Sequence, residues 1–135
     1  VCPRLTNPPG SSAYVVRGEM VYRTRAKEDR LGVPHELIAR HGAVSRAVAE
    51  AMASGMREAA RTDLALGITG IAGPGGGSAE KPVGLTYIAI ASAEGVICRE
   101  WRFLGDREIN KLLASQAALD MVRRHLMSRR DATPA

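Results

Sequence analysis

The chain has 135 residues, of which 45% are hydrophobic and 24% are charged. This size and balance are typical of one globular α/β domain and exclude a disordered or fibrous chain. No apolar run reaches the length of a membrane span, and the first residues show no signal-peptide pattern. We therefore expect a cytoplasmic protein that does not contact a membrane.

Basic residues exceed acidic ones, 19 to 14, which gives a formal net charge of +5. Such an excess is compatible with an ordinary solvated surface or with attraction of an anionic ligand such as a phosphate. No dense basic run is interleaved with aromatic residues, so nucleic acid is not an expected partner. The two cysteines, Cys2 and Cys98, and three scattered histidines form no metal-ligand pattern, and we expect neither a metal nor a cofactor.

The first third of the chain predicts a loop, a strand and two short helices. Residues 3–13 are rich in Pro, Gly, Asn and Ser, which marks a loop. Residues 14–23 alternate between apolar and polar side chains, which predicts a half-buried strand, and Gly18 within it indicates a bulge or a close approach. Residues 24–31 are compatible with a charged helix, and a second short helix is expected over 35–41.

The middle of the chain predicts a longer helix and a buried strand. Ser45 is a good N-cap for a helix that reaches about residue 61. An apolar stripe recurs along it at helical spacing: Val48, Met52, Met56 and Ala59. The short apolar run 64–68 lies between turn signals and suits a buried strand.

The last third predicts a hairpin and a long helix. Residues 83–93 and 96–103 read as two antiparallel strands joined at Glu94-Gly95. Asp106 can cap a helix that reaches about Leu126, and residues 127–135 read as a disordered tail. We expect the buried face of this helix to consist of Ile109, Leu112, Leu113, Leu119, Val122 and Leu126.

The order of these elements is strand, helix pair, strand, hairpin and helix, without repeats or a dividing linker. It predicts a single α/β domain over residues 1–135, with a mixed β-sheet between helices in a three-layer α/β/α arrangement.

The segment Thr69–Gly77 is the strongest candidate for a ligand-binding loop. It follows a predicted buried strand directly, where ligands usually bind in α/β sheets. Its glycines remove side chains, so backbone N–H groups can approach an anion or a developing oxyanion. Thr69 adds a hydroxyl. The segment matches neither a P-loop nor a dinucleotide fingerprint, and a plain crossover loop remains the alternative.

Lys27, with Tyr22 nearby in the sequence, is the candidate base. A lysine can deprotonate a serine once desolvation or a nearby cation lowers its pKa. Only three lysines occur beside sixteen arginines, and arginine cannot act as a base at neutral pH. The alternative is a solvated lysine on a charged helix.

The start of the last helix, Gly105-Asp106-Arg107, is a third candidate. Its free N–H groups and helix dipole favour an anion, and Arg107 could bind a phosphate with two N–H groups. Asp106 fits better as the helix cap. His41 could act as a general base, but a histidine at a helix end is more often structural, and neither cysteine has an activating partner.

Several segments together resemble the C-terminal domain of the CinA family, which is also known as the nicotinamide-nucleotide amidase family. They occur in the family's order and cover nearly the whole chain. The most specific is TGIAGPGGG followed by EKPVG. The matching segments are Pro9–Tyr14, Val21-Tyr22, Ala26-Lys27, Leu31–Pro34, His41–Ser45, Thr69–Gly77, Lys81–Gly84 and Gly105–Arg107.

The resemblance implies an α/β/α domain that is often a homo-oligomer. It implies deamidation of nicotinamide mononucleotide to nicotinate mononucleotide and ammonia, in pyridine-nucleotide salvage, without a metal. Lys27 matches the family's catalytic lysine and Tyr22 a tyrosine placed near it. Arg107 matches an arginine expected near the nucleotide phosphate. The residues that match the family's substrate loop are Thr69, Gly70, Gly73, Gly75 and Gly76.

The family's nucleophile is a serine in a Glu-Ser-Cys-Thr-Gly-Gly motif, and that motif has no counterpart in these 135 residues. The resemblance places it before Val1, so we expect the family's first strand and helix to be largely absent and residues 1–13 to form a loop. Pro3 would disrupt a helix interior. Ser11, Ser12 and Ser45 belong to other family motifs and are not candidate nucleophiles.

Three functions stay open on the sequence. The first is an amidohydrolase domain whose activity is impaired without the serine. The second is a non-catalytic module that binds a nucleotide or forms oligomers. The third is a competence or DNA-damage accessory protein, which the family's name suggests and the residues support little.

Overall fold

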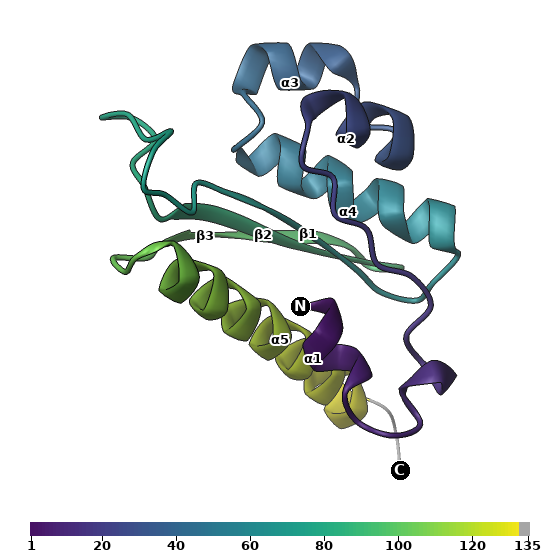
Figure 1. Cartoon of the computed structure of the whole chain (residues 1–135). Helices are drawn as coiled ribbons and strands as arrows, with labels where there is room; N and C mark the ends of the chain where they lie inside the picture. Colours follow the sequence, from purple (N-terminus) through teal and green to yellow (C-terminus); the bar gives the residue numbers. More distant parts are fainter. Residues whose placement is uncertain (133–135) are drawn as a thin grey trace.

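A computed structural model describes residues 1–132 of the chain. Helices cover both faces of one sheet, so the chain forms three layers, with α4 on one face and α5 on the other (Figure 1). The expected α/β/α arrangement is confirmed. The elements in chain order are α1 (Cys2–Thr6), the 3-10 helix η1 (Ser11–Ala13), α2 (Thr24–Leu31), α3 (His35–His41), α4 (Arg46–Ala60), β1 (Ala65–Gly70), β2 (Leu85–Ser92), β3 (Gly95–Arg102) and α5 (Arg107–Ala132).

The sheet has the strand order β1-β2-β3, and both pairs are antiparallel. We expected a mixed sheet, whereas among the described residues no parallel pair occurs. The hairpin is confirmed: Ser92 pairs with Gly95 across the turn, and Ile90 pairs with Ile97 further along. Antiparallel order brings the end of β1 and the end of β3 to the same end of the sheet, and this is where the site lies.

Alternation along β2 supplies the two faces of the core. Ala89 and Ala91 face α4, where they pack against Ala49 and Ala53. These small side chains let the helix come close to the sheet. At Gly67 of β1, an added Cβ would lie 2.4 Å from the carbonyl oxygen of Ala49. A larger residue at Gly67 would therefore push α4 off the sheet.

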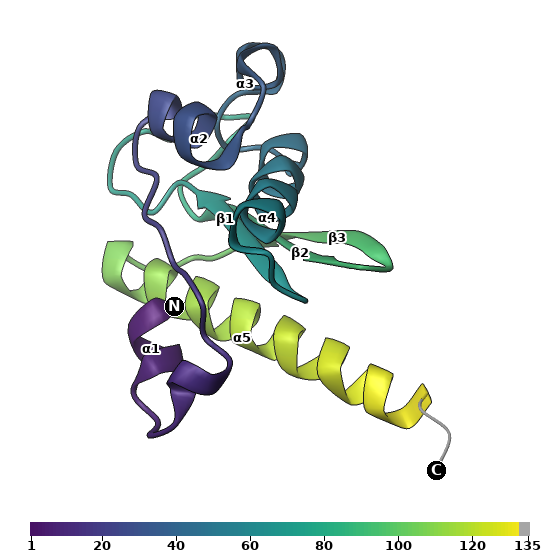
Figure 2. The same ribbon diagram turned by 90° about the vertical axis from the view of Figure 1, so that its right-hand side faces the viewer.

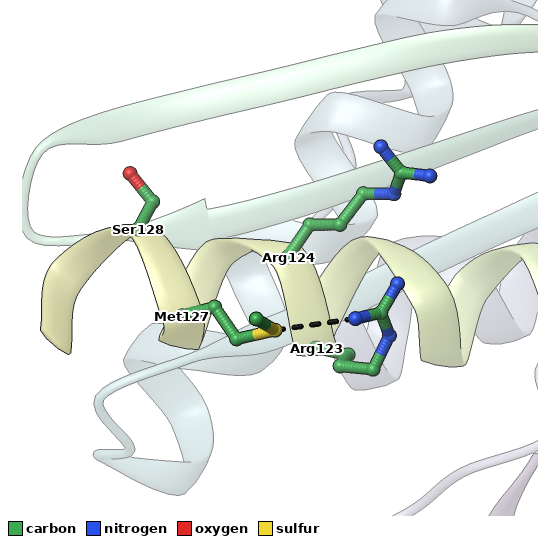
Figure 3. Close-up of a pocket in the computed structure, with 4 residues that line it drawn as sticks. All are labelled: Arg123, Arg124, Met127 and Ser128. Carbon is green, nitrogen blue, oxygen red and sulfur yellow. Dashed lines mark hydrogen bonds between the residues drawn. The ribbon is translucent and has the colours of Figure 1, made fainter. Parts of the chain in front are cut away.

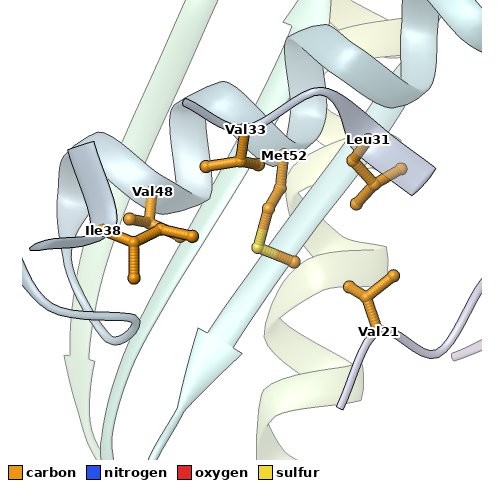
Figure 4. Packing of buried hydrophobic residues seen from close by; sticks show 6 residues of the cluster. All are labelled: Val21, Leu31, Val33, Ile38, Val48 and Met52. Carbon is orange, nitrogen blue, oxygen red and sulfur yellow. The ribbon is translucent and has the colours of Figure 1, made fainter. Parts of the chain in front are cut away.

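Ile88 and Ile90, on the other face of β2, pack against Ala118 and Met121 of α5. A third cluster lies on the outer side of α4, where α2, α3 and the segment before them cover it (Figure 4). Its buried members are Val21, Leu31, Val33, Ile38, Val48 and Met52. Of the stripe expected on α4, Val48 and Met52 are buried, Met56 is partly buried and Ala59 is exposed.

The strand expected over residues 14–23 does not form. This segment is extended but pairs with no strand of the sheet. It runs from the layer of α1 and α5 to the layer of α2 and α4 (Figures 1 and 2). The alternation of apolar and polar side chains correctly indicates an extended backbone. A β-strand also needs a neighbouring strand to pair with, and this segment has none among the described residues. The expected close approach at Gly18 is present, since a Cβ there would lie 2.2 Å from Sγ of Cys2.

The first residues are more helical than expected. Residues 3–13 were predicted to be a loop, but α1 covers Cys2–Thr6 and η1 covers Ser11–Ala13. Pro3 does not disrupt α1 because it lies in the first turn, where the missing N–H group is not needed. Arg4 ties α1 to α5, with Nη1 donating to Oγ of Ser115 over 3.0 Å.

The buried face predicted for α5 is largely wrong. Ile109, Leu112, Leu113 and Leu126 are between 39% and 58% exposed. Leu119 and Val122 are half-buried. The face that meets the sheet instead contains Ala118 and Met121, with Ser115 and Asn110 also buried. The helix also continues to Ala132, beyond the tail expected from residue 127, while residues 133–135 lie outside the described part of the chain.

The remaining local predictions are confirmed. The two short helices form as α2 and α3. Ser45 caps α4, because its Oγ accepts a hydrogen bond from the N–H of Val48 over 3.3 Å. Asp106 caps α5 through the N–H of Ile109 over 2.9 Å. Within residues 1–132, no helix combines the length and apolar character of a membrane span.

Candidate active site

The site is built where the connection between β1 and β2 meets the first turn of α5. Residues 71–84 leave the sheet after β1 and return to it at β2, and β3 delivers the chain to α5 at the same end. The base of the connection is closed by two backbone hydrogen bonds, from Ile71 N–H to Leu85 and from Gly84 N–H to Ile71. The predicted ligand loop is thus a β–β connection with a fixed base.

Lys27 is buried on the inner side of α2, with 7% of its surface exposed. Its Nζ donates a hydrogen bond to the carbonyl oxygen of Val21 over 2.8 Å. Burial lowers the pKa of Lys27 from the usual 10.5, because the charged form loses its water. This is the environment that a lysine base needs, and it excludes the alternative of a solvated lysine.

Arg107, on the first turn of α5, joins the loop to Tyr22. Its Nη1 donates to the carbonyl oxygen of Gly73 over 3.0 Å, and its Nη2 donates to the hydroxyl oxygen of Tyr22 over 2.8 Å. Tyr22 is otherwise exposed and directly follows Val21, the residue that holds the amine of Lys27. Three predicted site residues are therefore connected: the neighbours Tyr22 and Lys27, and the distant Arg107.

Thr69 and the glycines of the loop occupy different environments. Thr69 is buried, and its hydroxyl donates to the carbonyl oxygen of Ala43 over 2.8 Å. Gly73 is also buried, whereas Gly75 and Gly76 are exposed. At Gly75 an added Cβ would meet nothing within 4 Å. The structure thus places Thr69 in the frame of the site and the tip of the loop in solvent.

Gly70, the last residue of β1, is held close to its partner strand. A Cβ there would lie 2.7 Å from Oγ1 of Thr86. The glycine is therefore needed for sheet packing at the base of the loop, and its predicted contact with substrate stays a prediction.

Asn110 is a site residue that the sequence did not reveal. It is 2% exposed, and its Nδ2 donates to the carbonyl oxygen of Ala72 over 3.0 Å. Its Oδ1 accepts a hydrogen bond from the N–H of Gly105 over 3.0 Å. The only signal for it was its position three residues after Arg107, on the same side of the helix.

A second link fixes the far part of the connection. The amine of Lys81 donates to the carbonyl oxygen of His41 over 2.5 Å. This bond uses the backbone of His41 and does not involve its ring. Burial raises the pKa of the Cys98 thiol, which opposes nucleophilic activation of that residue.

Two hollows of the surface lie away from these residues. One open depression lies on the outer side of α5 and is lined by Arg123, Arg124, Met127 and Ser128 (Figure 3). A smaller hollow of about 100 Å³ lies between the hairpin and His125 of α5. Within residues 1–132, no group of three His, Cys, Asp or Glu side chains is arranged to hold a metal ion.

Curated relatives match nearly the whole chain. A CinA-like protein of Geotalea daltonii is 52% identical over 96% of this chain, and one of Acidobacterium capsulatum is 51% identical over 94%. The chain spans only about a third of their length, 31% in both cases.

Solved structures agree with the fold. The competence/damage inducible protein from Agrobacterium tumefaciens superposes with a TM-score of 0.89 at 44% identity, covering 91% of this chain and 76% of that one. A CinA superfamily protein from Klebsiella pneumoniae gives a TM-score of 0.90 at 29% identity, covering 94% and 79%. The family model named CinA C-terminal domain matches residues 1–126, and this chain belongs to that family.

Proposed function

We propose that the chain is an amidohydrolase domain that deamidates nicotinamide mononucleotide to nicotinate mononucleotide in cytoplasmic pyridine-nucleotide salvage. The observation that carries this proposal is the buried amine of Lys27, whose pKa is lowered and which bonds to Val21, the neighbour of Tyr22 in the tyrosine–arginine–loop network. A neutral amine in an apolar setting can accept the proton of a serine hydroxyl. That role is the family's, and the environment of Lys27 supports it.

The reaction assigns each group a step. A serine oxygen attacks the carboxamide carbon while Lys27 takes the hydroxyl proton, and that proton then leaves with the departing ammonia. Water hydrolyses the acyl-serine to the carboxylate. Arg107 uses two of its N–H groups on Gly73 and Tyr22, so the guanidinium keeps other donors for the phosphate of the nucleotide.

Ser11 and Ser45 are both engaged in local structure, not with Lys27. The hydroxyl of Ser11 donates to the carbonyl oxygen of Thr6 over 3.3 Å. Ser45 is buried and caps α4. We therefore propose that turnover requires the family's serine motif within the same polypeptide, and that residues 1–135 alone are impaired.

The test is ammonia release from nicotinamide mononucleotide by two proteins, the 135-residue chain and a version that carries the family motif before Val1. We expect release from the longer version only. Lys27→Ala in that version should lower the rate by about 10²- to 10⁴-fold, the usual contribution of a general base. Failure of the longer, folded version to release ammonia would reject the proposal, and release by the shorter chain would reject the need for the motif.

A second candidate is a non-catalytic module that binds the nucleotide, which the free donors of Arg107 favour. Calorimetry with nicotinamide mononucleotide would then show binding without turnover in both proteins. Arg107→Ala should weaken this binding by about tenfold or more, as expected for loss of a charge-assisted contact. Unchanged affinity would exclude Arg107 as the phosphate ligand.

A further inference from the structure

The first turn of α5 holds two consecutive carbonyl groups of the ligand loop. Asn110 binds the oxygen of Ala72 and Arg107 binds the oxygen of Gly73, each over 3.0 Å. The two side chains lie three residues apart, so they project from the same side of the helix. The orientation of the Asn110 amide is fixed by its partners, since Ala72 O can only accept and Gly105 N–H can only donate.

Holding these carbonyls determines where the loop's N–H groups point. The Ala72–Gly73 peptide bond is trans, so the N–H of Gly73 points opposite to the carbonyl that Asn110 binds. The next peptide carries no N–H, because its nitrogen belongs to Pro74. Gly73 is thus the one donor that this pair of held peptides presents on the side away from α5.

The N–H of Gly73 has no hydrogen-bond partner among residues 1–132, although Gly73 is buried. Buried backbone N–H groups are almost always paired. A side chain at this position is also excluded, since Gly73 has a φ of +92° and an added Cβ would lie 2.6 Å from Val83. The loop therefore holds a fixed donor that pairs with no group of residues 1–132.

We propose that the N–H of Gly73 donates a hydrogen bond to an oxygen of the ligand, and that Asn110 is the positioning residue that aims it. This inference rests on the proposed function for the identity of the ligand. Two groups of a nicotinamide nucleotide could accept the bond, the carboxamide through its oxygen and the phosphate through one of its oxygens. Asn110 itself touches the loop and the start of α5, not the reacting atoms.

Asn110→Asp separates the two contacts of this side chain. The new carboxylate still accepts from the N–H of Gly105, but it has no proton to donate to Ala72. Ser115→Ala is the matched control, because Ser115 is also a buried polar residue of α5 but bonds to Arg4 and Leu112, away from the loop.

The first measurement is hydrogen exchange of the 135-residue chain without ligand. In Asn110→Asp we expect the amides of Ile71 and Gly84, which close the base of the loop, to exchange at least about tenfold faster, as for loss of one hydrogen bond. Ser115→Ala should leave these amides unchanged. Equal exchange in Asn110→Asp and the wild type would overturn the positioning role.

The second measurement is affinity for nicotinamide mononucleotide, nicotinamide riboside and ribose 5-phosphate across pH. At neutral pH, Asn110→Asp should bind about tenfold more weakly than the wild type, while Ser115→Ala binds normally. On acidification the introduced carboxyl gains a proton, can donate to Ala72 again, and should recover part of the loss. Asp106 and Arg107 flank the position in both proteins, so the ratio of variant to wild type isolates this recovery.

The outcomes are distinct. If Asn110→Asp weakens binding of both the mononucleotide and the riboside, the N–H of Gly73 contacts the carboxamide oxygen. If it weakens binding of both the mononucleotide and ribose 5-phosphate, the N–H contacts the phosphate. Wild-type binding that Asn110→Asp leaves intact overturns this inference while the proposed function stands. If the wild type binds none of the three probes, both the ligand contact of Gly73 and the proposed nucleotide binding are overturned. The hydrogen-exchange data then still decide whether Asn110 holds the loop.

Discussion

The lowered pKa that suits Lys27 to act as a base also makes the stability of the protein depend on pH. Its pKa is lowered in the folded protein, so between that lowered value and 10.5 the unfolded chain binds more protons than the folded one. The free energy of unfolding contributed by Lys27 therefore rises with pH across this window. We expect Lys27→Met to remove that rise, as measured by urea unfolding at a series of pH values from neutral to alkaline.

Lys111→Met is the control for this experiment, because Lys111 is exposed on α5. It should keep the wild-type pH dependence. The raised pKa of Tyr87, which results from burial and its bond to Glu100, affects all three proteins alike. The same slope in Lys27→Met and the wild type would mean that Lys27 is not desolvated in solution.

Glu19 makes the protein less stable in acid, as expected for a carboxyl group whose pKa is lowered by folding. Hydrogen bonds from Arg30 and Arg17 lower its pKa from 4.5 to about 2. Its contribution to stability is thus complete above 4.5 and is lost as the pH falls towards 2. We expect Glu19→Gln to unfold more easily than the wild type near neutral pH, and the difference to shrink in acid. Thermal unfolding of both proteins checks this, with the exposed Glu108→Gln as a control that should show no such convergence.

Much of the site follows from local sequence, because its residues lie in short motifs: the glycine loop, Tyr22 with Lys27, and Arg107 after the cap of α5. Asn110 could not be found this way. An asparagine in a helix usually faces solvent, and only the approach of Ala72, 38 positions away, makes it part of the site.

At the scale of elements, the start of α4 depends on one hydroxyl. Ser45 accepts from Val48 N–H and donates to the carbonyl oxygen of Gly42. Ser45→Ala should lower the free energy of unfolding by about 1 kcal/mol, the usual cost of losing an N-cap. Chemical denaturation measures the change. Ser54→Ala, at an exposed position inside the same helix, should be neutral or slightly stabilising, and an equal loss in both would exclude a capping effect.

Elements that are defined by local pattern were predictable, and those that depend on a partner were not. The hairpin and the caps need only neighbouring residues. Residues 14–23 have the alternation of a strand, yet no described strand lies in register with them. On α5, hydrophobicity alone favoured the leucines, but a helix packs closely on a sheet through small side chains such as Ala118.

At the scale of the whole molecule, apolar side chains of α5 and of the segment just before it lie in solvent. Leu104 is 96% exposed and Leu112 is 58% exposed. Exposed apolar groups of this kind favour association. We expect sedimentation velocity to show a concentration-dependent oligomer, and Leu112→Glu to shift it towards the monomer. Gln116→Glu adds the same charge at another exposed position of α5 and should not do so. A monomer at all concentrations would contradict this prediction.

The extended segment 14–23 is the only covalent connection between α1 and the rest of the chain. It crosses from one layer to the other (Figure 2), and Arg17 and Arg23 within it are exposed. Limited trypsin treatment should therefore cut there first. Arg4 still bonds to Ser115 and Gln116 of α5, so the severed N-terminal peptide should remain bound to the larger fragment and separate from it only on denaturation. The N-terminal peptide would then be held on α5 by side-chain contacts alone. A separately supplied peptide should therefore bind the larger fragment and restore the domain.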